Sequence, residues 1–287
     1  MGRDTPSTVT AVGDFGEDTT VSGSEGQYHA NVSRDWEIWG PMGGYVAAMA
    51  LRAAAAEVLP PFEPASFTCQ FLSSAKFEPV DIAVEIRRRS RRAAAVSVRI
   101  TQNSTPILDA QVWFSIPSEV VQYDHATPHR HGRPEEHPPI SEYTFEPSVF
   151  PFWENFEGRP IDWIDDPSTY PGGEPEWAEW LRFVPTAEFA DPVLEAARVL
   201  LLADLPSFPA ATRAFPGDER TFVSPSLDLA VQFHRLREIG EWLLVQGVTP
   251  IAERGLLGFR SEVWNATGQI LASGSGQLLA RSTAPTG

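Results

Sequence analysis

The sequence predicts an α+β fold in which one unit occurs twice, each unit being a curved antiparallel sheet wrapped around a buried helix. Three observations support this prediction. An apolar helix follows a Gly-Gly corner, stretches with a two-residue hydrophobic alternation follow the helix, and a second helix with its own alternating stretches repeats the arrangement. A helix that is apolar on nearly every side has to be enclosed, and this one is too short and too charged to span a bilayer.

The first central helix is expected to begin after the Pro- and Gly-containing residues 40–44 and to end before Pro60. Strong helix formers fill residues 45–58, and only Arg52 and Glu57 interrupt the apolar surface. The many alanines allow a neighbouring backbone to approach closely. The natural enclosure is a curved antiparallel sheet.

The strands of the first unit have a period of two, so that apolar and polar residues alternate. A short strand and a turn are expected over residues 28–39, before the helix. Four strands are expected after it, at residues 66–72, 80–87, 93–101 and 107–115.

The middle of the chain breaks this pattern, and we interpret residues 119–175 as a linker or excursion that packs through its aromatic residues. Residues 1–24 are expected to be a flexible tail, residues 25–118 the first unit and residues 176–283 the second. The middle segment is rich in histidine and glutamate, but its proline content and irregular spacing argue against a metal site. The residues in question are His125, His129, His131, His137, Glu135 and Glu136.

The second unit repeats the first at an offset of about 162 residues, because Gln70-Phe71 corresponds to Gln232-Phe233. Its helix is expected to open at Asp191-Pro192, with Asp as N-cap and Pro at the first helical position. Pro206, Pro209 and Pro216 are expected to end the helix and to carry a long loop. Strands are expected at residues 177–184, 226–234, 242–248, 256–264 and 270–279. Each unit leaves a sheet edge open, so we expect the two units to pair edge to edge.

Composition narrows the functional classes. The formal net charge of −16 argues against nucleic acid and against an anionic membrane surface. The single cysteine, Cys69, excludes a disulfide framework and suits a reducing compartment, so a cytoplasmic location is expected. The N-terminal residues lack an apolar stretch and are not expected to be a signal peptide.

The chain resembles the double hotdog fold, and in detail the TesB-type acyl-CoA thioesterase II family. The resemblance covers about residues 25–118 and 175–283. The residues that carry it are Trp39-Gly40-Pro41-Met42-Gly43-Gly44-Tyr45-Val46-Ala47-Ala48, Asp228, Phe233-His234-Arg235, Trp242-Leu243-Leu244 and Leu271-Ala272-Ser273.

The resemblance implies hydrolysis of acyl-CoA thioesters by a water molecule that an Asp, a Thr or Ser, and a Gln hold, without a covalent intermediate. It assigns these roles to Asp228, Thr249 and Gln277. Gln277 lies one residue later than the family pattern, where Gly276 stands, and one residue reverses the face of a strand unless a bulge intervenes. The first unit has Ser66 where the second has Asp228, so one active site per chain is expected.

Two further groups are candidate substrate-binding residues. The backbone N–H groups of Gly43 and Gly44, at a helix N-terminus, would polarise a thioester carbonyl. Arg88 and Arg91, within the basic run at residues 87–92, would clamp the phosphates of coenzyme A; a solvated turn is the alternative.

Two other functions remain open from the sequence. The first is a non-catalytic acyl-thioester binding protein on the same fold, which the shifted Gln277 favours. The second is a hotdog hydratase, although this chain lacks the Asp/His pair that such enzymes use. No Gly-x-Ser-x-Gly motif occurs, which argues against a serine hydrolase. We expect no cofactor besides the coenzyme A of the substrate, no membrane insertion and, by family analogy, a homodimer.

Overall fold

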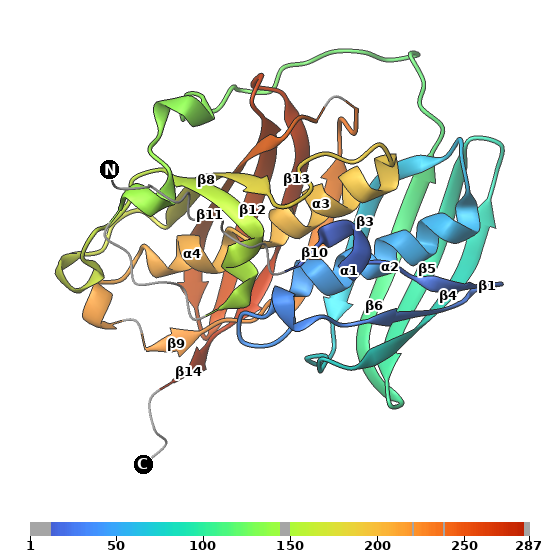
Figure 1. Ribbon diagram of the computed structural model, residues 1–287, viewed down its shortest axis with the longest axis horizontal. Coiled ribbons are helices and arrows are strands. Elements are labelled where there is room, and N and C mark those ends of the chain that lie inside the picture. Colours follow the sequence, from blue (N-terminus) through green and yellow to red (C-terminus); the bar gives the residue numbers. More distant parts are fainter. Residues whose placement is uncertain (1–12, 144–149, 220, 238, 284–287) are drawn as a thin grey trace, which may run out of the picture.

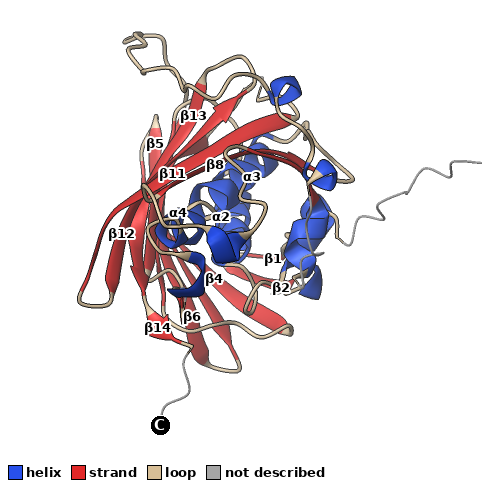
Figure 2. Ribbon diagram, turned by 90° about the vertical axis from the view of Figure 1, so that its left-hand side faces the viewer, coloured by secondary structure: helices blue, strands red, loops and turns tan. Residues whose placement is uncertain are grey.

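A computed structural model describes residues 13–143, 150–219, 221–237 and 239–283. Twelve strands form one antiparallel sheet in the order β1-β2-β4-β5-β6-β3-β10-β13-β12-β11-β8-β7. The sheet curves around the central helices, as Figure 2 shows. Its strands are β1 (Ser22–Ser24), β2 (Gln27–Asn31), β3 (Glu63–Phe71), β4 (Pro79–Arg89), β5 (Ala93–Gln102), β6 (Thr105–Ser115), β7 (Phe156–Pro160), β8 (Glu176–Phe183), β10 (Asp228–Phe233), β11 (Trp242–Glu253), β12 (Leu256–Asn265) and β13 (Ile270–Leu279).

Four α-helices lie on the concave side of the sheet or at its ends (Figure 1). The described residues also form a separate two-stranded sheet, which includes residues 281–282, and six 3-10 turns. The helices are α1 (Phe15–Asp18), α2 (Gly43–Val58), α3 (Pro192–Asp204) and α4 (Ser207–Thr212); the short strands are β9 (Phe222–Val223) and β14 (Arg281–Ser282); the turns are η1 (Arg34–Trp36), η2 (Pro134–Glu136), η3 (Ile140–Glu142), η4 (Pro151–Asn155), η5 (Pro167–Thr169) and η6 (Gly217–Glu219).

The two units join where β3 pairs with β10. Asp228 lies opposite Gln70, and Leu229 lies opposite Cys69, in an antiparallel register. The expected edge-to-edge pairing is therefore confirmed, and it turns two half-sheets into one. Each unit contributes one central helix to the concave side.

The central helices α2 and α3 run side by side, and their contact depends on Gly44. A Cβ atom at Gly44 would lie 2.8 Å from the Leu201 Cα and 2.9 Å from the Leu201 carbonyl oxygen. Only glycine permits this approach without a shift of the backbone. The helices cross so that the first turn of α2 meets the last turn of α3, where Asp204 lies.

Three details differ from the sequence-based expectations. Residues 13–24 form α1 and β1 rather than a tail, because Phe15 packs 5.4 Å from Trp36 and 5.3 Å from Phe183 between ring centroids; residues 1–12 lie outside the described residues. Pro209 lies within α4 rather than in a loop. The N–H groups in the first turn of a helix have no intrahelical acceptor, so a proline there removes no helical hydrogen bond.

The third difference concerns the expected linker. Residues 119–175 contribute β7, which pairs with β8 and forms the last strand of the sheet. Its packing through aromatic residues is confirmed, since Phe152 and Phe156 are buried around Trp36. The segment is therefore part of the second unit's wall.

Candidate active site

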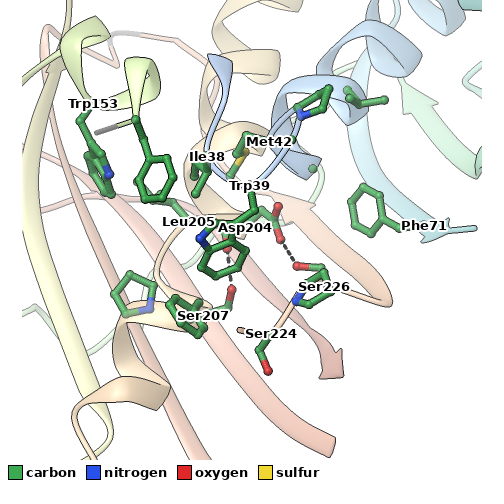
Figure 3. Close-up of a pocket in the computed structure, with 18 of the residues that line it drawn as sticks. Ile38, Trp39, Met42, Phe71, Trp153, Asp204, Leu205, Ser207, Ser224 and Ser226 are labelled. Carbon is green, nitrogen blue, oxygen red and sulfur yellow. Dashed lines mark hydrogen bonds between the residues drawn. The ribbon is translucent and has the colours of Figure 1, made fainter. Parts of the chain in front are cut away.

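A cavity of about 980 Å³ lies where the first turn of α2 meets the last turn of α3 (Figure 3). Its central part carries oxygen atoms from Asp204, Ser207, Ser224 and Ser226. The walls around this part are apolar, and they are formed by Ile38, Trp39, Met42, Val46, Phe71 and Leu205. An ionisable group surrounded by apolar walls is the usual arrangement of a small-molecule site.

Asp204 is the charged centre of this cavity and is 5% exposed. Its Oδ2 accepts the backbone N–H of Gly44 at 2.9 Å, and its Oδ1 accepts the Ser226 hydroxyl at 2.8 Å. Burial raises the pKa of Asp204 to about 6, while these two hydrogen bonds oppose that rise. A carboxylate with such a pKa is ionised at neutral pH and accepts a proton readily, which suits a general base.

The two helices have opposite effects on this carboxylate. The N-terminus of α2 carries partial positive charge and favours an anion, and Gly44 supplies the donor. The C-terminus of α3 carries partial negative charge and disfavours an acidic side chain there. The position of Asp204 is therefore costly for α3 alone, and the contact with α2 offsets part of that cost.

A second part of the cavity is aromatic and extends toward β7 and β8. On β8, the alternate residues Trp177, Glu179 and Leu181 line it, and Phe156 and Gly158 line it from β7. Trp153 and Trp163 complete this wall. Two carboxyl groups belong to this part, those of Glu154, which follows Trp153, and of Glu179. Glu179 is 6% exposed, and burial raises its pKa to about 8.

Asp228 and Gln277, the predicted base and its partner, lie on neighbouring strands and face away from this cavity. Along β10, Leu229 and Val231 are buried while Asp228 and Gln232 are not, so Asp228 lies on the other face of the strand. Gln277 is exposed beside the buried Leu278. Neither residue lines the cavity.

Thr249 lies on the inner face and is separated from both. It is buried, and its hydroxyl donates to the Ser207 carbonyl oxygen at 3.0 Å. Two strands, β13 and β12, separate β10 from β11, which is about 14 Å along the sheet. The structure thus does not bring Asp228, Thr249 and Gln277 around one water position. The catalytic roles assigned to them stay predictions.

Gly276, the residue at the family's glutamine position, comes too close to its neighbours to accept a side chain. A Cβ there would overlap the Asp228 carbonyl oxygen and lie 2.8 Å from the Phe259 ring. The bulge that would turn Gln277 inward is absent from the described pairing, in which Gly276, Gln277 and Leu278 continue the register with β12.

Arg88 and Arg91 lie far from Asp204. The neighbouring Arg89 donates to the Val58 carbonyl oxygen at 3.0 Å, which places this hairpin at the C-terminus of α2. Asp204 meets the opposite end of the same 16-residue helix, about 24 Å away at the usual helical rise. Arg281 is the arginine that lines the cavity.

The sequence analysis identified Gly43 and Gly44 but missed Asp204 and Ser226. Gly43 lines the cavity, and a Cβ there would lie 2.9 Å from the Asp204 Oδ2. One signal for Asp204 was available: an acidic residue in the last turn of an otherwise apolar helix opposes the helix dipole. No comparable signal marked Ser226, whose role depends on the fold.

The chain shares its fold with solved structures of double hotdog proteins. One is a protein of unknown function with a hot dog fold from Alicyclobacillus acidocaldarius, with a TM-score of 0.79, 21% identity and coverage of 95% of this chain and 98% of that one. Another is the acyl-CoA thioesterase II TesB2 from Mycobacterium marinum, with a TM-score of 0.74, 21% identity and coverage of 95% and 98%. A tesB protein from Mycobacterium avium subsp. paratuberculosis has a TM-score of 0.73, 21% identity and coverage of 95% and 100%. The expected double hotdog architecture is confirmed.

Sequence profiles identify the family. Residues 32–115 match the acyl-CoA thioesterase N-terminal domain, and residues 125–280 match the acyl-CoA thioesterase C-terminal domain. The chain therefore belongs to the acyl-CoA thioesterase family. Comparison with curated proteins finds no significant match.

Two absences hold for residues 13–143, 150–219, 221–237 and 239–283. None of the helices in these ranges combines the length and apolar character needed to cross a bilayer. Within the same ranges, no three or more histidine, cysteine, aspartate or glutamate side chains are grouped so that they could hold a metal ion.

Proposed function

We propose that the protein hydrolyses acyl-CoA thioesters in this cavity, with the Asp204 carboxylate as general base. The observation that carries the proposal is an ionisable carboxylate, fixed by two hydrogen bonds, that lines a cavity whose walls are mostly apolar. Family membership supports the substrate class.

The reaction follows from ordinary thioester chemistry. A water molecule held by Asp204 attacks the thioester carbonyl carbon while the carboxylate takes one of its protons. The first turn of α2, which includes the Gly43 N–H, stabilises the negative charge that develops on the carbonyl oxygen. The C–S bond then breaks, the proton passes from Asp204 to the departing sulfur, and the products are a carboxylic acid and free coenzyme A.

Ser226 positions the base in this scheme. Its hydroxyl donates to one oxygen of Asp204, and the Gly44 N–H donates to the other. The carboxylate therefore keeps one orientation, with a remaining lone pair on each oxygen for water. Restricting the base to one geometry is what converts a weak carboxylate into an effective catalyst.

The test is release of free thiol from acyl-CoAs of short, medium and long chains. Asp204→Asn should lower turnover by about 100- to 10,000-fold, the usual contribution of a general base. Asp228→Asn is the matched control, since it makes the same chemical change on the outer face of the sheet. Full activity of D204N, or an equal loss in D228N alone, would return the catalytic role to the sequence-based candidates Asp228, Thr249 and Gln277.

A non-catalytic acyl-thioester binding protein is the second candidate function. The absence of an inward side chain at Gly276 favours it, because one water-holding group of the family pattern is missing. Binding of acyl-CoA by the unaltered protein without any thiol release would support this alternative.

The wider setting is also proposed from the sequence and the family. We propose a cytoplasmic homodimer that needs no cofactor beyond the coenzyme A of its substrate. Sedimentation of the full chain tests the dimer, and an unchanged rate after treatment with a chelator tests the cofactor proposal.

A further inference from the structure

Glu179 is a buried carboxyl group in the aromatic part of the cavity, and the proposed reaction makes no use of it. Along β8, its side chain points to the same face as Trp177 and Leu181, which also line the cavity. Within the described residues, no hydrogen bond or ion pair is formed by its carboxyl oxygens. A buried carboxyl group without a protein partner has its hydrogen-bonding capacity left for a group inside the cavity.

The neighbouring strand leaves space for this carboxyl group. A Cβ at Gly158 would lie 2.5 Å from the Glu179 Oε1, so any larger residue on β7 would displace the carboxyl. The pKa of Glu179 is raised to about 8, and burial is the cause. At neutral pH the group is therefore a neutral carboxylic acid, which offers one donor and one acceptor.

The position of Glu179 relative to Asp204 indicates which part of the substrate reaches it. Ser226, the partner of Asp204, lies two residues before β10, whereas Glu179 lies on β8. Strands β13, β12 and β11 lie between them, an arc of about 19 Å along the curved sheet, so the two groups line different parts of the cavity and are closer than this arc in a straight line. The cavity also contains Arg281, a cation suited to phosphate, on the exposed β14.

The aromatic part is thus the place for the acyl group, and the end with Arg281 suits the coenzyme. This assignment rests on the proposed function. We propose that Glu179 selects acyl groups that carry a hydroxyl group remote from the thioester, over unsubstituted acyl groups of the same length. The apolar walls hold the chain, and the carboxyl group binds the hydroxyl as both donor and acceptor.

The size of the preference for hydroxylated chains follows from the free-energy cost of leaving a buried carboxyl group unpaired. An unsubstituted chain leaves the carboxyl group desolvated and unpaired, whereas a hydroxylated chain pairs it. We expect a preference of about 10- to 100-fold for the hydroxylated chain, the range given by one buried hydrogen bond.

The experiment compares acyl-CoAs in matched pairs, with and without a terminal hydroxyl, from six to twelve carbons. One readout is kcat/KM for thiol release. The other is calorimetric binding of the matching coenzyme A thioethers, in which the carbonyl is replaced by CH2 so that no hydrolysis occurs. The binding readout separates this proposal from the proposed reaction, because it is independent of catalysis.

Three variants make the test specific. Glu179→Leu should abolish the preference, whereas Glu179→Gln should keep most of it, because the amide also donates and accepts. Glu176→Gln, on the exposed end of the same strand, is the control and should leave the preference unchanged. Equal binding of both members of every pair by the unaltered protein, or an undiminished preference in E179L, would overturn the proposal. Preference in binding without any thiol release would leave it standing and refute only the hydrolase.

Discussion

The Ser226 hydroxyl donates a 2.8 Å hydrogen bond to the Asp204 Oδ1, linking the segment before β10 to the last turn of α3. The other carboxylate oxygen accepts from Gly44, at the first turn of α2. The candidate base is thus held from two sides by groups far apart in the chain. Each of these contacts can be tested separately.

The bond from Ser226 affects the pKa of Asp204. Because the ionised form is the base, kcat/KM should rise with pH through about 6, the pKa to which burial raises Asp204. The hydrogen bond from Ser226 favours the ionised form and lowers that pKa. Ser226→Ala should therefore move the rise in kcat/KM to higher pH, as measured in a pH–rate profile. Ser226→Thr keeps a hydroxyl and should retain the original profile; identical profiles for all three proteins would contradict this role.

Gly44 should matter for stability as well as for the site. Gly44→Ala places a methyl group 2.8 Å from the Leu201 Cα, where overpacking costs about 1 to 3 kcal/mol of the free energy of unfolding. Urea denaturation measures this loss. The matched control is Gly258→Ala on β12, where a Cβ has no atom within 4 Å. If G44A is as stable as G258A, the close packing of the two helices is not a constraint.

Glu179 should make stability depend on pH in an unusual direction. Its pKa is about 8 in the folded protein and near 4.5 when unfolded, so between these values the folded state binds more protons. The contribution of Glu179 to the free energy of unfolding should therefore be fully present below about pH 4.5. It should decrease as the pH rises to about 8, by up to about 1.4 kcal/mol per pH unit.

Glu179→Gln removes this contribution. The difference in unfolding free energy between E179Q and the unaltered protein should grow from pH 5 to pH 8, as followed by chemical denaturation. A difference that stays constant with pH would mean that the carboxyl group is ionised in the folded state.

Two groups of arginines are candidates for binding the phosphates of coenzyme A, and variants can distinguish them. Arg281 lines the cavity, whereas Arg88 and Arg91 lie at the other end of α2. We expect Arg281→Ala to raise KM several-fold at low salt, with a smaller effect at high salt because screening weakens the contact. The double change Arg88→Ala and Arg91→Ala should leave KM unchanged. The reverse result would restore the phosphate clamp that the sequence predicts.

The fold could be predicted from the sequence because its signals are local. The alternation of apolar residues identified the long strands, and the apolar run at residues 45–58 identified α2. The repeat then required two units, and open edges required them to pair. Short elements escaped this reasoning, since α4 begins at a proline-rich stretch and β7 has only five residues, too few to establish an alternation.

The site could be predicted only in part because its contacts are long-range. Gly44 and Asp204 are 160 residues apart in the chain, and only the crossing of α2 and α3 brings them together. Asp228 was the more conspicuous acid because it lies in an apolar strand, yet strand alternation places it on the outer face. The face of the sheet on which Asp228 lies and the point where α2 contacts α3 are properties of the assembled fold. No single segment of the sequence specifies them.

The contact between α2 and α3 also means that the candidate site draws on both units of the chain. The first unit supplies the Gly44 N–H donor, and the second supplies the Asp204 carboxyl group. Cutting the chain between the two units would therefore leave neither fragment with both groups.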